Sequence, residues 1–256
     1  MKNLIYKIIE LFYPSGKSIR ISGITIRLPF RFRNYYQADY EIEHINFFKQ
    51  RIKQNSVVLD IGAQLGLMSK VFSDLTGAGG KVFAFEPAPY TFKTLCKTIE
   101  MNMMGHTVIP VQKAVSDKKG TTQFFISKMK LDPANSLVDY KRKHDFESID
   151  VHVTSVDDFV VDQDLAKVDF IKIDAEGAEY EVLLGAQKTL QKHRPVIHLA
   201  LHPAALKSFG SSMHQIYHFI VSNNYELLFK SKVMNEQDFT SSQDFFDVEL
   251  IPKHLN

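Results

Sequence analysis

The sequence has almost no cysteine, since Cys96 is the single one in 256 residues. One cysteine cannot close an intramolecular disulfide, and no Cys-x-x-Cys or Cys/His spacing is present for a structural zinc. Secreted disulfide-held domains and zinc fingers are therefore excluded. We expect a protein of the reducing cytoplasm.

The sequence also lacks a strong charge of one sign. Lysine and arginine total 31 against 29 aspartates and glutamates, so the formal net charge is +2. Because so weak a field does not recruit a polyanion, we expect no nucleic-acid partner.

No apolar run is long enough to cross a bilayer. Residues 1–13 are rich in apolar side chains, but Lys7 and Glu10 interrupt them, and a spanning helix needs roughly 20 residues. We expect an amphipathic helix lying on the domain. A peripheral contact of this segment with a membrane or a partner is the alternative.

The composition is that of a soluble globular protein, with 45% hydrophobic and 23% charged residues. From residue 57 onward, short apolar runs alternate with segments of helical periodicity. Buried strands that alternate with helices predict a mostly parallel sheet covered on both faces, which is the α/β class. The predicted strands are 57–61, 81–85, 108–111, 168–173 and 196–201; the predicted helices begin at 67 and span 91–101, 180–190 and 213–223.

The start of the chain is interpreted as a small N-terminal cap over residues 1–50. It holds a hairpin at 19–28, where polar and apolar residues alternate around a glycine, and a helix at 40–52. This helix leads into the main domain, residues 51–256.

Two segments depart from the strand-helix alternation. Residues 225–230 and 248–251 are predicted strands, at least one of them antiparallel, joined by a polar loop in which no helix fits. Residues 127–148 form a long polar stretch, which predicts a substrate-facing lid loop. Its basic run at 141–143 is expected to be a solvated loop face, with recognition of an acidic substrate as the alternative.

A glycine-bearing turn follows the first predicted strand, and in open parallel sheets ligands bind beyond the carboxyl ends of the strands. A dinucleotide fingerprint would need glycine at positions 64 and 67, so Gln64 and Leu67 disfavour an NAD-dependent dehydrogenase. The carboxylate of Asp60 would repel a pyrophosphate and attract a cation, such as the sulfonium and amino groups of S-adenosylmethionine. The turn residues predicted to bind this cofactor are Asp60, Gly62, Ala63, Gln64 and Gly66.

An acidic residue ends the second predicted strand. Glu86 follows Gly62 by 24 residues, near the spacing of about 20 at which a carboxylate accepts the ribose hydroxyls of an adenosine cofactor. Pro87 comes next. After the third strand, the adenine edge is predicted to lie against Ala114, Ser116 and Asp117.

Three carboxylates follow the fourth predicted strand. Glu176 and Glu179 suit the positive end of the next helix dipole, which explains them without a ligand. Asp174 is the last residue of a buried strand and would face the cleft where methyl donor and acceptor meet. We therefore predict that Asp174 contacts both cofactor and acceptor.

The runs VVLDIGAQLG, KVFAFEP, AVSDKKG, VDFIKIDAEGAEYEVLLGAQKTL and RPVIHLALHP resemble the FkbM family of S-adenosylmethionine-dependent methyltransferases, over about residues 40–203. The resemblance implies the class I methyltransferase fold, a Rossmann-like, doubly wound, mostly parallel seven-stranded sheet with one antiparallel strand. It also implies that the turn around Gly62 binds the methionine part, that Glu86 holds the ribose and that Asp174 stands at the catalytic strand end. Residues 135–137 are similar to a family segment as well.

One position departs from the family. Members commonly carry a glutamate two residues before the fifth-strand histidine, whereas this chain has Ala200 before His202. His202 is our first candidate for the base that a hydroxyl acceptor needs, because an imidazole of near-neutral pKa can accept that proton. Asp174 is the second candidate, and His198 is expected to be a core histidine. A divalent metal is an alternative, with ligands drawn from Asp174, Glu176, Glu179 and His202.

The leading hypothesis is an O-methyltransferase that acts on a hydroxyl of a sugar, glycan or small natural product, the acceptor class that the resemblance implies. A catalytically degenerate cofactor-binding partner protein is the alternative, motivated by Ala200. A methyltransferase of nucleic-acid bases would call for an Asn/Asp-Pro-Pro-aromatic segment and a basic groove. Residues 174–177 read Asp-Ala-Glu-Gly instead.

Overall fold

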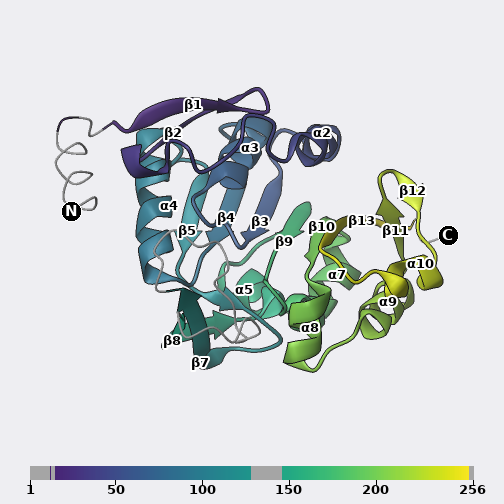
Figure 1. The fold of residues 1–256 in the computed structure, drawn as a ribbon. Helices are drawn as coiled ribbons and strands as arrows, with labels where there is room; N and C mark the ends of the chain where they lie inside the picture. Colours follow the sequence, from purple (N-terminus) through teal and green to yellow (C-terminus); the bar gives the residue numbers. More distant parts are fainter. Residues whose placement is uncertain (1–11, 13–14, 128–145, 254–256) are drawn as a thin grey trace.

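A computed structural model describes Phe12 and residues 15–127 and 146–253. An eight-stranded sheet forms its centre (Figure 1). Five neighbouring strands run parallel, β13 is antiparallel to both of its neighbours, and β11 returns to the common direction. The spatial order is β12 (Lys232–Val233), β11 (Tyr225–Phe229), β13 (Phe246–Pro252), β10 (Val196–Leu201), β9 (Phe170–Ile173), β3 (Val57–Ile61), β4 (Lys81–Phe85) and β5 (Val108–Val111).

This sheet confirms the α/β class and the mostly parallel order with an antiparallel strand near one edge. The seven strands implied by the family resemblance are present, and the two-residue β12 extends them by one. The order reverses between β3 and β9, because the chain runs outward from β3 to β5 and then returns to β9. Ligands bind at such a switch point in doubly wound sheets.

Successive side chains of the strands point to opposite faces of the sheet and belong to two hydrophobic clusters. Leu59 and Phe83 belong to one buried cluster, and Val58 and Val82 belong to the other. Helices α5 (Val156–Asp162), α6 (Glu179–Leu184), α7 (Gln187–His193), α8 (Pro203–Phe209) and α9 (Met213–Ser222) contribute to the first cluster. The second includes α2 (Ile42–Arg51), α3 (Leu67–Thr76), α4 (Pro89–Met101) and the hairpin β1 (Lys17–Ile21)–β2 (Ile24–Leu28), followed by the single turn η1 (Phe30–Phe32).

The predicted helix at 180–190 is wrong in one respect, because the structure breaks it into α6 and α7 at Gly185. The carbonyl oxygen of Gly185 accepts a hydrogen bond from the backbone N–H of Asp157 (2.8 Å). A Cβ at position 185 would lie 2.2 Å from the carbonyl oxygen of Ser116. The glycine therefore lets the chain between α6 and α7 pack against the backbone that follows β6, and α6 ends there. The short α5 and α8 were not predicted.

The polar tail segment contains a helix that the sequence analysis excluded. Helix α10 (Glu236–Ser241) lies between β12 and β13, and the side chain of Asn235 caps it by accepting the N–H of Asp238 (2.9 Å). Phe239 is fully buried in the first cluster. One buried side chain in six residues leaves no visible periodicity, which explains the error.

The predicted loop at 127–148 lies largely outside the described residues, as do the segments 135–137 and 141–143. Its two ends belong to strands that were not predicted, β7 (Gly120–Ser127) and β8 (Phe146–Thr154). These pair antiparallel, and β8 also pairs with β6 (Ala114–Val115) in a separate sheet. The lid function stays a prediction.

The predicted N-terminal contact segment also falls outside the described residues, Phe12 excepted. Within the described ranges, every helix is too short or too polar to traverse a bilayer.

Candidate active site

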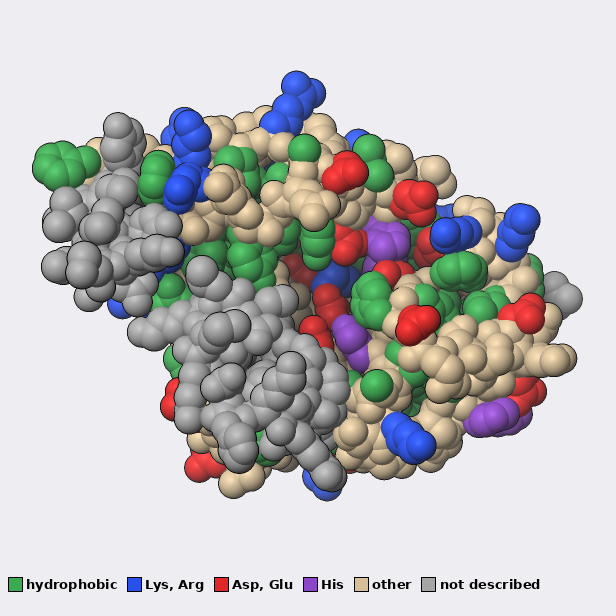
Figure 2. Space-filling model, in the orientation of Figure 1, with side chains coloured by type: hydrophobic (Ala, Val, Ile, Leu, Met, Phe, Trp, Pro, Cys, Tyr) green, Lys and Arg blue, Asp and Glu red, His purple; other side chains and the backbone are tan. Residues whose placement is uncertain are grey.

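A cavity of about 370 Å³ opens beyond the carboxyl ends of the central strands. This volume lies within the ~300–1,000 Å³ typical of small-molecule and cofactor sites. Acidic, lysine and histidine side chains gather in a hollow at the centre of the face shown in Figure 2. The lining includes Gly62, Ala63, Gln64, Glu86, Pro87, Ala114, Lys172, Asp174, Glu176, His198, His202 and Asp247.

The turn after β3 is built around Gly62. Its φ is +81°, and a Cβ there would lie 2.1 Å from the carbonyl oxygen of Asp174. The backbone N–H groups of Gly62 and Ala63 both donate to the carbonyl of Phe85 at the end of β4, at 3.1 and 2.9 Å. Three strand ends are thus held together at the floor of the cavity, and only glycine fits at the crossing.

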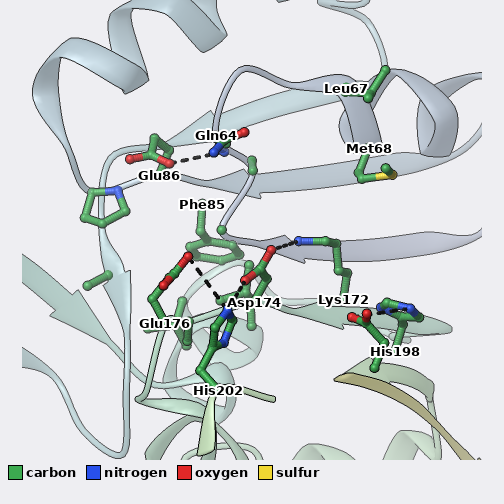
Figure 3. Close-up of a pocket in the computed structure, with 18 of the residues that line it drawn as sticks. Gln64, Leu67, Met68, Phe85, Glu86, Lys172, Asp174, Glu176, His198 and His202 are labelled. Atoms are coloured by element: carbon green, nitrogen blue, oxygen red, sulfur yellow. Dashed lines mark hydrogen bonds and ion pairs between the residues drawn. The ribbon is translucent and has the colours of Figure 1, made fainter. Parts of the chain in front are cut away.

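Glu86 lies at one end of the cavity. Its two carboxylate oxygens accept backbone N–H groups, from Gln64 at 3.1 Å and from Ala88 at 3.0 Å. Burial raises the pKa of Glu86 to about 7, against the lowering effect of these bonds. Figure 3 shows Glu86 beside Gln64 and far from His198, with Asp174 and Lys172 between. The two backbone hydrogen bonds hold this carboxyl group in place at its end of the cavity.

Asp174 follows β9 and meets a buried lysine. Lys172 Nζ donates to Asp174 Oδ2 at 3.1 Å, and this lysine is 8% exposed. Burial alone would raise the pKa of Asp174, but the charge and hydrogen bond of Lys172, with the charge of His202, hold it below its usual value. Asp174 is therefore an ionised, weakly basic group at the centre of the cavity.

His202 follows β10 and is surrounded by carboxylates. Its Nδ1 lies 2.8 Å from Glu179 Oε1, and its Nε2 lies 3.7 Å from Glu176 Oε1 and 3.9 Å from Asp174 Oδ1. Burial alone would lower the pKa of His202, but the hydrogen bond to Glu179 and the surrounding negative charges raise it to about 9. The near-neutral pKa expected from the sequence is therefore wrong. His202 is protonated at pH 7 in this structure.

Several predicted cofactor contacts lie away from the cavity lining. Asp60 is fully buried, with Oδ2 accepting the hydroxyl of Ser69 at 2.6 Å, and burial raises its pKa. Gly66 precedes α3 and approaches Leu95. Ser116 and Asp117 bond to each other at 3.3 Å beyond β6. The cavity brings together the other predicted residues, Gly62, Ala63, Gln64, Glu86, Pro87, Ala114, Asp174 and His202.

The metal alternative rests on a cluster that the structure reproduces in part. Asp174, Glu176 and His202 each offer one ligand atom, and these atoms lie within 4.8 Å of one another. Glu179 is not in that set, and its Oε1 instead bonds to His202 Nδ1 and accepts the N–H of Gly177. A metal at this cluster stays a prediction.

The sequence analysis missed lining residues that come from the chain before α2 and from β13. Tyr36 donates its hydroxyl to Gln64 Oε1 (3.2 Å), and its ring packs against Tyr40 with centroids 5.0 Å apart. Asp247 in β13 is the register partner of Ala200 in β10. These residues lie outside the motifs that carried the analysis, and only the folded chain brings them to the cavity.

The departure at Ala200 has a structural counterpart. Ala200 is buried, and residues paired directly across antiparallel strands point to the same face. The side chain of Asp247, which lines the cavity, therefore lies next to Ala200, the position at which the resemblance implies a glutamate.

The sheet order, the glycine turn and the acidic residue ending β4 define the chain as a class I methyltransferase domain of the Rossmann-like kind. The family profile described as "Methyltransferase FkbM domain" matches residues 60–227. The chain belongs to the FkbM methyltransferase family.

The chain is also similar to curated methyltransferases, and it shares its fold with a solved structure. The chain is similar to the hexuronic acid methyltransferase AglP of Haloferax volcanii, at 29% identity over 61% of each chain. It is also similar to the 2-O-methyltransferase NoeI of Sinorhizobium fredii, at 29% identity over 56% of this chain and 62% of that one. The matches thus span about three fifths of these relatives' lengths. The crystal structure of a precorrin-6y C5,15-methyltransferase from Geobacter metallireducens shares the fold, with a TM-score of 0.50, 16% identity, and 86% and 92% of the two chains covered.

Proposed function

We propose that the protein is an S-adenosylmethionine-dependent O-methyltransferase that methylates a hydroxyl group of a sugar or glycan. The observation that carries the proposal is that Glu86, Asp174 and His202 line one cavity. The carboxylate of Glu86 suits the ribose hydroxyls of the cofactor, and Asp174 and His202 suit the acceptor. Two relatives support this acceptor, since one is a hexuronic acid methyltransferase and the other a 2-O-methyltransferase.

The chain offers groups that suit S-adenosylmethionine. Glu86 is held by two backbone N–H groups and can accept ribose hydroxyls. Gly62 lines the cavity, and because it has no side chain the turn packs directly against the carbonyl oxygen of Asp174. Asp174 is ionised and provides negative charge for an ammonium or sulfonium group. When bound, this cofactor supplies an electrophilic methyl group on a positively charged sulfur.

The residues around Asp174 can hold the acceptor and take its proton. Glu179 fixes the ring of His202 through Nδ1, which leaves Nε2 facing Asp174 and Glu176. In its neutral form, Nε2 accepts the hydroxyl proton while the new C–O bond forms and the C–S bond breaks. The ionised Asp174 accepts a hydrogen bond from the acceptor and orients it. Alignment of donor and acceptor supplies much of the remaining rate.

The test is methyl transfer from isotopically labelled S-adenosylmethionine to a panel of hexuronates, hexoses and oligosaccharides. We expect labelled product with at least one acceptor. Glu86→Gln should weaken cofactor binding, whereas Asp174→Asn should lower turnover. His214→Gln on the exposed face of α9 is the matched control and should leave both unchanged.

The catalytically degenerate alternative remains the second candidate, because Ala200 stands where the family resemblance implies a glutamate. Cofactor binding without transfer to any member of the panel would favour it. Absence of cofactor binding would contradict both functions.

A further inference from the structure

A second polar cluster lies at the opposite end of the cavity from Glu86. His44 on α2, His198 on β10 and Asp247 on β13 each present a ligand atom, and these atoms lie within 4.8 Å of one another. His198 and Asp247 line the cavity directly. Figure 3 shows His198 on the side of Lys172 away from His202. The cluster is therefore distinct from the Asp174–His202 group, although both face one cavity.

His198 is buried without a hydrogen-bonding partner. Its side chain is 2% exposed, and neither ring nitrogen bonds to any of the described residues. Packing explains the ring, since Phe48 and His44 lie at centroid distances of 5.0 and 4.6 Å. Packing does not explain why both ring nitrogens are buried without a hydrogen bond, because an unsatisfied buried polar atom lowers the stability of the fold by about 1–3 kcal/mol. An imidazole nitrogen of His198 therefore has a lone pair available for a ligand.

The other two members are arranged to share such a ligand. Asp247 Oδ2 lies 3.6 Å from His44 Nε2, and Asp247 Oδ1 lies 4.0 Å from His198 Nε2. Both distances are too long for hydrogen bonds and slightly longer than the ~3.0–3.4 Å between ligand atoms around a metal with bonds of about 2.1 Å. The three ligand atoms, all within 4.8 Å of one another, would have to move closer together to bind one ion.

The outer contacts of the cluster also suit a metal. His44 Nδ1 is bonded to the carboxylate of Glu41, which leaves Nε2 as the free nitrogen that faces Asp247. Metal-binding histidines commonly donate their second N–H to a carboxylate in this way. A third carboxylate, Glu249, is the register partner of His198 and has a buried oxygen without a partner among the described residues.

We propose that His44, His198 and Asp247 bind one divalent transition-metal ion at the acceptor end of the cavity. Two imidazoles and one carboxylate are donors that suit zinc, iron or cobalt, and they leave coordination positions open. Because His198 and Asp247 line the cavity, a ligand in the cavity could occupy those open positions. Resting on the proposed function, the second part of the inference is that the ion binds an acceptor oxygen and lowers the pKa of the hydroxyl to be methylated.

Two of the three residues of this site lie outside the family match. His44 precedes residues 60–227 and Asp247 follows them, whereas His198 lies within them. Helix α2 and strand β13 would then meet across the metal.

The test is cobalt(II) binding to the full chain, followed by absorption spectroscopy and by competition with zinc(II). We expect one equivalent bound with visible d–d bands. The variants His198→Gln and Asp247→Asn should each weaken binding by more than about 100-fold, and Glu41→Gln by about 10–100-fold. Glu41 is partly exposed, so this last variant keeps the test usable if a buried substitution impairs folding.

Two further variants separate this site from others. The double variant His214→Gln/His218→Gln removes an exposed histidine pair beside Glu236 and should leave cobalt binding unchanged. Glu176→Gln should also leave it unchanged. Absence of stoichiometric binding, or loss of binding in either control, would overturn the inference. S-adenosylmethionine affinity and methyl transfer are measured on the same samples, so intact methyl transfer without metal binding would refute the metal site alone.

Discussion

The carbonyl oxygen of Asp174 occupies the space that a side chain on Gly62 would need, at 2.1 Å from an ideal Cβ. The two residues end neighbouring parallel strands, β3 and β9, and the N–H of Asp174 donates to the carbonyl of Ile61 at 3.1 Å. Because position 62 is glycine, the turn after β3 can lie close to the backbone of Asp174. The carboxylate of Asp174 is the group that we propose to contact the acceptor.

The first prediction is that Gly62→Ala weakens S-adenosylmethionine binding by more than tenfold. The left-handed φ alone costs about 1–2 kcal/mol, and the contact with the Asp174 carbonyl adds to it. Titration calorimetry and thermal unfolding measure the two effects. Gly23→Ala is the matched control, because Gly23 has φ +83° and nothing within 4 Å of its ideal Cβ. Equal loss of cofactor affinity in both variants would contradict the explanation.

The second prediction concerns the pH dependence of cofactor binding. The pKa of Glu86 is about 7, above the ordinary value because the carboxyl is buried. The ionised form accepts ribose hydroxyls, so binding should be strong above pH 7 and should weaken by about tenfold between pH 8 and pH 6. Glu86→Gln should bind weakly at both values and lose this dependence. The same slope in the variant would assign it to the ligand's own amino group.

Much of the fold could be predicted because its strands are short, apolar and separated by recognisable helices. Residues 57–61, 81–85, 108–111 and 196–201 form strands at the bounds that the sequence indicates. Position 185 shows the limit. The pattern on both sides of Gly185 is helical, and the break depends on contacts with Ser116 and Asp157, which are distant in sequence.

The candidate site could be predicted where a strand end carried the signal. Gly62, Glu86 and Asp174 follow strands directly, and all three line the cavity. Tyr36 and Asp247 could not be found in this way. They lie outside the strand-end motifs, before α2 and in β13, and they line the cavity only because the chain folds. The raised pKa of His202 was missed for a related reason, since it depends on three carboxylates brought together by a turn.

The third prediction is structural. Asp157 accepts N–H groups from Lys188 and Thr189 and the hydroxyl of Thr189, at 2.7–2.9 Å, and so caps α7 from α5. Asp157→Ala should lower the free energy of unfolding by about 2 kcal/mol, measured by urea denaturation. Asp162→Ala, which removes an exposed ion pair with Lys119, should change it little. Equal losses would show that α7 does not depend on this cap.

The fourth prediction distinguishes the two candidate bases by the pH profile of kcat/KM. The pKa of His202 is about 9, because the hydrogen bond to Glu179 and the nearby carboxylates outweigh the effect of burial. If neutral His202 takes the hydroxyl proton, the rate should rise about tenfold per pH unit between pH 7 and pH 8 and level off near pH 9. Glu179→Gln removes the carboxylate at Nδ1 and should move the plateau to lower pH. Asp174 is ionised throughout this range, so a flat profile in the wild type, unchanged by Glu179→Gln, would assign the proton transfer to Asp174 and leave His202 as a positively charged positioning residue.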